Sequence, residues 1–317
     1  MPPPGTASPL RVWTALAVVY VVWGSTYLAI VYVVETMPPL LAASMRFALA
    51  APLLAAFLLV RRGPRAFRAS PRQLLTAAGI GVLLLAGGNG GVTLAEDRGL
   101  PSGLAALLVA ALPLFVVVLR LIARDRPTPL TLVGVAIGFA GVALLLLPGN
   151  RPDGVTVVAA LLVVGGTLSW AVGSFAATRL ALPPDQLLTT VVEMAGGAIA
   201  LLVTGVLAGE RLDVGAVEAQ SWWGLAYLVV FGSVVAFTAY TWLLGNAPVS
   251  QVATYAYVNP VVAVGLGALF VGEQVTGTTA LGGLVTLVAV AVVVTEEGRR
   301  RRALTADAPV LAVEPAR

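Results

Sequence analysis

Two ionisable residues, Arg46 and Glu193, fall well inside long apolar stretches of the sequence. A charge at the centre of a bilayer costs about 3 kcal/mol on insertion scales, so such a residue normally faces a cavity or a partner. A guanidinium can hold a substrate carboxylate with two parallel hydrogen bonds, and Glu193 could hold a substrate amine or a coupling proton. In the competing interpretation, Arg46 reaches the outer headgroups and Glu193 bonds to a neighbouring helix. Both interpretations stay open at this stage, as does a direct ion pair between the two.

Polar and aromatic side chains at interior depths are the next candidates to line a cavity. Belts of Trp and Tyr at the membrane interface are the alternative explanation, but they account best for rings near the ends of spans. The set expected to contribute to a substrate site, beside Arg46 and Glu193, is Trp23, Ser25, Tyr27, Asn89, Trp170, Ser174, Tyr240, Tyr257 and Asn259.

Pro113 and Pro260 fall in the middle of apolar stretches. Each proline removes a backbone hydrogen bond and frees a carbonyl four residues earlier, at Val109 and Ala256. Free backbone groups at that depth are tolerated only inside protein or beside a watery cavity. We therefore expect kinked cavity walls or hinges at both prolines, with a static packing kink as the alternative.

Four further residues have milder expected roles. Glu96 and Glu273 lie near helix ends and are expected to be solvated loop charges. Gly134 and Gly138 form a small-xxx-small face, which predicts tight helix packing inside one subunit, with a dimer contact as the minority interpretation.

The composition requires lipid as the main solvent. Of the 317 residues, 59% are hydrophobic and only 11% are charged, whereas a soluble domain carries about a quarter charged residues. The chain has no Cys and no His, which excludes disulfides, Cys/His zinc sites, His-ligated haem and His-dependent triads. We expect no catalytic residue, metal, cofactor or nucleic-acid partner. An intramembrane enzyme acting on lipid or lipid-linked substrates and a membrane scaffold are the alternatives to a carrier.

Ten stretches are long and apolar enough to cross a bilayer, which takes about 20 residues. Charged residues separate most of them, and the run Gly245-Asn246-Ala247-Pro248 divides the longest because these residues end helices. The predicted spans are 11–35, 36–60, 72–96, 98–120, 126–151, 154–178, 186–209, two within 219–272, and 274–295.

The arginines predict the orientation. All 19 basic residues are Arg, and with a cytoplasmic N-terminus 15 of them fall in cytoplasmic segments and three in outer ones. Positive charge collects on the cytoplasmic side of membrane proteins. Both termini are therefore predicted to be cytoplasmic.

The two halves of the sequence resemble each other at a period of about 147 residues. Trp23-Gly24-Ser25 is echoed by Trp170-Ala171-Val172-Gly173-Ser174, and Pro38-Pro39 by Pro183-Pro184. Pro113 and Pro260 correspond in the same way. Because each unit has five spans, the second must be inverted, as is typical of secondary transporters with a site at the midplane. The predicted fold is an all-α membrane protein of ten transmembrane helices, in two inverted five-helix repeats (12–150 and 151–297) around a central cavity, followed by a cytoplasmic tail (298–317).

Longer motifs carry a family resemblance. Trp23-Gly24-Ser25-Thr26-Tyr27, Met37-Pro38-Pro39-Leu40 and Arg46-Phe47 resemble the first repeat of EamA-type carriers in the drug/metabolite transporter superfamily, and 253–262 with Gly272-Glu273 resembles the second. Gly88-Asn89 and Ala95-Glu96 look closest to the YedA-like inner-membrane branch. Leu112-Pro113 stands where the second half has Asn259-Pro260, so symmetric roles for the two prolines do not follow. The resemblance implies a multi-pass inner-membrane carrier, usually an exporter of amino acids or related small metabolites, with a small-molecule substrate and the lipid bilayer as partners. Proton coupling and the choice between monomer and homodimer stay open.

Overall fold

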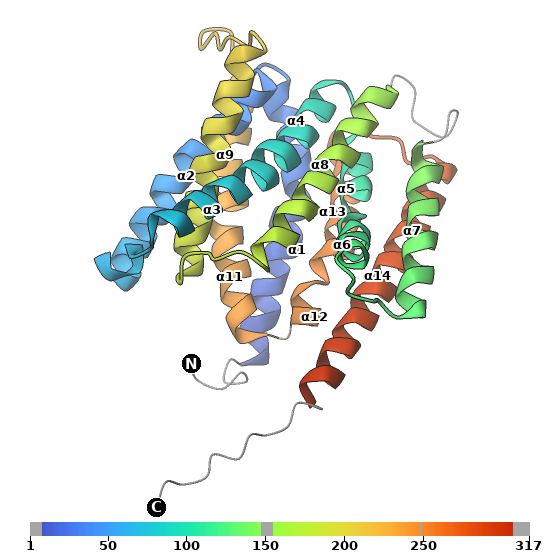
Figure 1. Cartoon of the computed structure of the whole chain (residues 1–317). Helices are drawn as coiled ribbons and strands as arrows, with labels where there is room; N and C mark the ends of the chain where they lie inside the picture. Colours follow the sequence, from blue (N-terminus) through green and yellow to red (C-terminus); the bar gives the residue numbers. More distant parts are fainter. Residues whose placement is uncertain (1–7, 147–154, 248, 307–317) are drawn as a thin grey trace, which may run out of the picture.

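The computed structural model describes residues 8–146, 155–247 and 249–306, and in these ranges every regular element is helical (Figure 1). The first half contains α1 (Pro9–Val34), α2 (Pro39–Arg62), the 3-10 turn η1 (Pro64–Phe67), α3 (Pro71–Gly81), the π-helical segment η2 (Val82–Asn89), α4 (Gly90–Asp97), α5 (Ser102–Val109), α6 (Leu112–Ile122) and α7 (Pro129–Leu146). The second half contains α8 (Val157–Ala177), α9 (Gln186–Leu207), α10 (Ala219–Tyr227), the π-helical segment η3 (Leu228–Val235), α11 (Ala236–Asn246), α12 (Val249–Val252), α13 (Tyr255–Phe270) and α14 (Gly277–Ala306).

These elements make ten spans. Within the described ranges, nine helical segments are long and apolar enough to cross a membrane. The tenth span is α13, a shorter apolar helix that the single turn of α12 precedes. The predicted break near 245–248 is confirmed, since α11 ends at Asn246 and Ala247 is extended; Pro248 lies outside the described residues, as does the predicted boundary at 150/151.

The two halves repeat one pattern in opposite directions. In each half the third span is interrupted by a π-helical segment and the fourth is broken into two helices. In Figure 1, α1 starts at the lower end of the bundle, whereas α8 starts at the upper end. We call the end where α1 begins and α14 finishes the terminal end, and the end where α2 begins and α9 finishes the opposite end. The predicted inverted five-helix repeats are therefore present.

Local sequence explains where several helices begin. Pro39, Pro71 and Pro129 occupy the first helical positions of α2, α3 and α7, where the missing N–H costs nothing. Ser70 and Gln73 form a capping box at the start of α3: the Ser70 hydroxyl accepts from the Gln73 N–H, and the Gln73 side chain accepts from the Ser70 N–H. These capping groups fix the direction in which each span enters the bundle.

The last spans of the two halves, α7 and α14, pack closely through small residues. A Cβ on Gly141 would lie 3.1 Å from the Gly282 carbonyl oxygen, and a Cβ on Gly282 would lie 3.2 Å from the Gly141 carbonyl oxygen. A Cβ on Gly134 would likewise crowd Val293 of α14, and a Cβ on Gly138 would crowd Leu114 of α6 and Ala289 of α14. The small-residue face therefore packs inside the subunit, as the sequence predicts.

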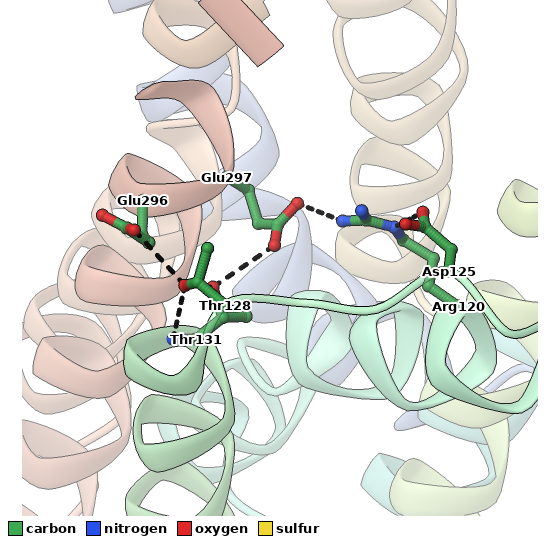
Figure 2. A network of polar contacts seen from close by, with 6 residues as sticks. All are labelled: Arg120, Asp125, Thr128, Thr131, Glu296 and Glu297. Atoms are coloured by element: carbon green, nitrogen blue, oxygen red, sulfur yellow. Dashed lines mark hydrogen bonds and ion pairs between the residues drawn. The ribbon is translucent and has the colours of Figure 1, made fainter. Parts of the chain in front are cut away.

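A polar network joins α14 to the first half at the terminal end (Figure 2). Arg120 on α6 donates to Asp125 at 2.7 Å and forms an ion pair with Glu297. Thr131 donates to Glu297 at 3.3 Å and Thr128 donates to Glu296 at 3.3 Å. This network links the two repeats at the terminal end.

Candidate functional site

The two π-helical segments occupy equivalent places in the repeats. Val82 and Leu228, which begin η2 and η3, are 146 positions apart. A π-helical turn leaves backbone groups out of the regular ladder and often occurs at functional sites. Both segments contribute to one site, η2 through Gly88 and Asn89 and η3 through Ser233.

A cavity of about 120 Å³ lies between the repeats, and both halves line it. This volume is smaller than the ~300–1,000 Å³ of pockets for drug-sized ligands, which favours a small metabolite. The lining residues are Trp23, Thr26, Tyr27, Ile30, Arg46, Gly88, Asn89, Val92, Val109, Leu112, Gly166, Thr167, Trp170, Phe237, Tyr255 and Asn259.

Arg46 is the charged residue of this cavity. Its side chain is 6% exposed, and its Nε donates to the Ser233 hydroxyl of η3 at 3.0 Å. In the described part of the chain no carboxylate lies within ion-pair distance of Arg46. The guanidinium is thus positioned by one neutral partner, and its cation has no protein counter-ion in the cavity wall.

Aromatic rings close the cavity toward the terminal end. The Trp23 ring lies 5.2 Å from Phe237, 5.1 Å from Tyr240 and 5.3 Å from Tyr255, measured between centroids. The Trp23 indole N–H donates to the Gly232 carbonyl at 3.2 Å, a carbonyl of the π-helical segment η3. Such offset contacts each contribute about 1 kcal/mol beyond the area that they bury. We call this cluster of rings (Trp23, Phe237, Tyr240 and Tyr255) the aromatic floor of the cavity.

The mid-span prolines differ from each other. Pro113 stands at the start of α6, after a break at 110–111, and the Val109 that precedes this break lines the cavity. Pro260 is buried inside the continuous helix α13. The second break lies earlier, between α12 and α13. Asn259, 8% exposed, lines the cavity, and its amide nitrogen can donate to the Tyr20 and Tyr255 carbonyls at 3.3 Å each.

The structure brings together six of the eleven predicted substrate-site residues. Those that line the cavity are Trp23, Tyr27, Arg46, Asn89, Trp170 and Asn259. Tyr240 belongs to the aromatic floor through its contacts with Trp23 and Tyr255.

Four predicted residues lie elsewhere. The Ser25 hydroxyl bonds to Tyr227 at 2.6 Å and to the Val22 carbonyl, so it joins α1 to α10. Ser174 and Tyr257 are partly buried but do not line the cavity. Glu193 is partly buried on α9, forms no ion pair with Arg46, and lies within electrostatic range of Tyr240.

Several important residues were missed at the level of the sequence. Tyr255, rather than Tyr257, faces the cavity, because positions two residues apart on a helix point to opposite faces, about 200° apart, and the break before α13 resets the helical register. Ser233 binds Arg46, and no sequence signal pairs the two. Glu96 was expected to be a solvated loop charge, but it is 5% exposed. That expectation is wrong because the last turn of α4 is covered by the helices around it.

The fold and the cavity together define a polytopic membrane protein built like a secondary transporter. Comparison with known proteins agrees. The model of the EamA-like transporter family matches residues 11–147 and 157–295. The chain is 41% identical over 271 residues to the uncharacterized inner membrane transporter YedA of Escherichia coli (strain K12), covering 84% of this chain and 85% of that protein. The chain therefore belongs to the EamA-like transporter family, and the resemblance to the YedA-like branch is confirmed.

Two more distant matches extend the comparison. A probable amino-acid metabolite efflux pump of Escherichia coli (strain K12) is 26% identical over 272 residues, covering 83% of this chain and 88% of that protein. A solved crystal structure, 21% identical, shares the fold with a TM-score of 0.61 over 92% of this chain and 98% of that chain. Because the family and its relatives are transporters, this protein is a multi-pass inner-membrane transporter and not an enzyme.

Proposed function

We propose that this transporter exports amino acids or related small carboxylate-bearing metabolites by alternating access, with the central cavity as its substrate site. The observation that carries the proposal is the Arg46 guanidinium, which is buried in the cavity wall and has no acidic partner among the residues that the structure describes. An arginine held in this way attracts a carboxylate and can bind it through two hydrogen bonds. The amino-acid metabolite efflux pump among the relatives supports the same substrate class.

The other cavity residues fit the rest of such a substrate. Trp23, Tyr27 and Trp170 offer apolar faces for a side chain, and Asn89 and Asn259 offer amide groups for an amine or a hydroxyl. We assign Glu193 and Tyr240 to the wall between the cavity and the terminal end, since neither lines the cavity. Pro113 would serve as a hinge, because the fourth span is already broken beside it.

We further infer that the repeats occupy 12–150 and 151–297, that both termini are cytoplasmic and that 298–317 form a cytoplasmic tail. The Arg distribution supports this orientation. On this basis the terminal end faces the cytoplasm and the opposite end faces outward. Single cysteines placed at Arg68 and at Gly215 in the Cys-free chain should be labelled by a membrane-impermeant thiol reagent from inside and from outside, respectively.

The test begins with the substrate. Metabolites outside cells that overproduce the protein should include a carboxylate-bearing compound at a raised level, compared with cells carrying an empty vector. An unchanged extracellular profile would argue against export.

Arg46 variants then test the site. Arg46→Ala should weaken binding of that compound by at least about 30-fold, because losing a buried charged contact costs about 2 kcal/mol or more. Arg46→Lys should recover only part of the lost binding, since lysine keeps the positive charge but cannot form the two parallel hydrogen bonds of a guanidinium. Arg61→Ala, an arginine at the terminal end, is the matched control and should transport normally. Normal flux through Arg46→Ala would remove Arg46 from the site.

A further inference from the structure

Glu96 on α4 carries a buried carboxyl group. Its side chain is 5% exposed, and in the described part of the chain neither carboxylate oxygen has a hydrogen-bond partner. A fully charged carboxylate that lacks hydrogen-bond donors is costly inside a protein. A bound proton or a cation would neutralise the charge and remove most of this cost.

The ionisable groups around Glu96 come from few elements. Glu273, in the loop after α13, and Tyr27 on α1 lie within electrostatic range of it. Arg46 on the neighbouring helix α2 is bonded to Ser233. The elements α5, α8 and η2, which also pack against α4, contribute no ionisable side chain. On α4 itself, Asp97 lies 4.0 Å from Arg98.

Glu273 does not stabilise the Glu96 carboxyl group, because both carboxylate oxygens of Glu273 already accept hydrogen bonds from the backbone. They accept from the Ser102 N–H at 2.6 Å and from the Gly103 N–H at 3.0 Å. The described residues also hold no group of three acidic, Cys or His side chains that could bind a metal ion. A proton is therefore the cation that this environment suits.

A line of residues connects Glu96 with the cavity. Asn89, Thr93 and Glu96 follow at intervals of four and three residues on one face of the third span, so they lie one above another. Thr93, Asn89 and Arg46 also line a small void of about 10 Å³, roughly the space for one water molecule. Tyr27 lines the cavity as well. Glu96 thus lies about 10 Å from Asn89 along the helix, toward the opposite end.

We propose that Glu96 is the proton-binding site of this carrier, loaded from water when the opposite end opens and emptied when the terminal end opens. The step is balanced: a carboxylate oxygen forms an O–H bond with a proton from one aqueous phase, and the same bond breaks to release a proton to the other phase. This inference rests on the proposed transport function. It assigns the coupling proton to Glu96 instead of Glu193, which is partly accessible and does not line the cavity.

The proton site can be tested without a substrate. The full-length protein in phosphatidylglycerol/phosphatidylcholine vesicles would be followed by infrared difference spectroscopy while the pH is changed. We expect a pH-dependent C=O stretch of a protonated carboxyl group in the wild type. Glu96→Gln should lose this band, Glu96→Asp should keep it at a shifted frequency, and Glu193→Gln should keep it unchanged. An identical band in Glu96→Gln would overturn the proposal.

Transport separates this inference from the proposed function. With the exported metabolite as the probe, Glu96→Gln should lose export driven by a pH gradient and keep exchange of labelled for unlabelled metabolite across equal pH. Full pH-driven export by Glu96→Gln would refute the proton site while leaving the exporter intact. Failure of the wild type to export any metabolite would refute the exporter, and the infrared result would still decide the proton site.

Discussion

The two ends of the bundle are held together by different chemistry. At the opposite end, two carboxylates of the second repeat bind backbone N–H groups of the first. Glu210 accepts from Leu40 at 3.1 Å and from Leu41 at 2.9 Å, at the start of α2. Glu273 accepts in the same way from the first two N–H groups of α5. Each carboxylate satisfies free N–H groups at a helix N-terminus, where the helix dipole favours negative charge.

At the terminal end, arginines of the first repeat bind carboxylates of the second. Arg62 contacts Asp185 at 2.6 Å, and their side chains are 53% and 13% exposed. Arg120 contacts Glu297, and these side chains are only 14% and 13% exposed. One end is therefore joined through backbone amides and the other through ion pairs.

Two equivalent turns of the repeats share a backbone conformation but make different polar contacts. Gly272-Glu273 follows the fourth span of the second repeat, and Arg124-Asp125 follows the fourth span of the first, 148 positions earlier. Gly272 and Arg124 share a left-handed backbone, with φ of 66° and 63°. The same turn places Glu273 at a helix N-terminus and Asp125 beside Arg120. Arginines gather at the terminal end, so the carboxylates that join the repeats there pair with cations, whereas Glu210 and Glu273 join the repeats at the opposite end by binding backbone N–H groups.

Removing a buried ion pair should have the largest effect. Glu297→Ala leaves Arg120 inside the protein with Asp125 as its remaining ion-pair partner, and it removes the acceptor of Thr131 (Figure 2). We expect the free energy of unfolding in detergent to fall by about 3 kcal/mol. Glu296→Ala, which removes only a 3.3 Å contact from Thr128, should cost less than about 1 kcal/mol. Equal losses in the two variants would show that the buried pair contributes little.

Removing a helix cap should have an intermediate effect. Glu273→Ala leaves the first N–H groups of α5 unsatisfied and should lower stability by about 1–2 kcal/mol. Glu273→Gln, which keeps one acceptor oxygen, should lose less. The measurement is the midpoint of thermal unfolding of the purified protein. A stability unchanged from the wild type would mean that water replaces the carboxylate at no cost.

The exposed ion pair should matter least for stability. Arg62→Ala should cost at most about 1 kcal/mol, because solvent screens an exposed pair and its side chains lose entropy. High salt should reduce the difference from the wild type further. The control Arg61→Ala removes a neighbouring arginine that stacks on Phe57. A large, salt-independent loss in Arg62→Ala would remove the contrast between the exposed and buried pairs.

The sequence predicts the transmembrane architecture of this molecule well. Apolar length, Gly and Pro breaks and the spacing of arginines predict all ten spans and the inverted repeat, because lipid imposes these features along the chain itself. Residues held in place by a single helix, such as Arg46 and Asn89, could also be placed near the cavity.

Other parts of the site depend on contacts between distant segments. The choice of Tyr255 over Tyr257 follows from a break between two short helices, and the burial of Glu96 follows from helices distant in sequence, such as α1 and α8, that pack against α4. The contact between Arg46 and Ser233 needs the two repeats to be folded against each other. No local pattern contains this information.

Alternate opening of the two ends around one cavity can be measured most directly by closing each end in turn. The chain has no native cysteine, so cysteine pairs at Leu41 and Glu210, or at Arg62 and Asp185, can be joined by a reducible bifunctional reagent. The account predicts that either cross-link stops export of the metabolite and that reduction restores it, while single-cysteine variants are unaffected by the reagent. Undiminished export with either end cross-linked shut would contradict alternating access.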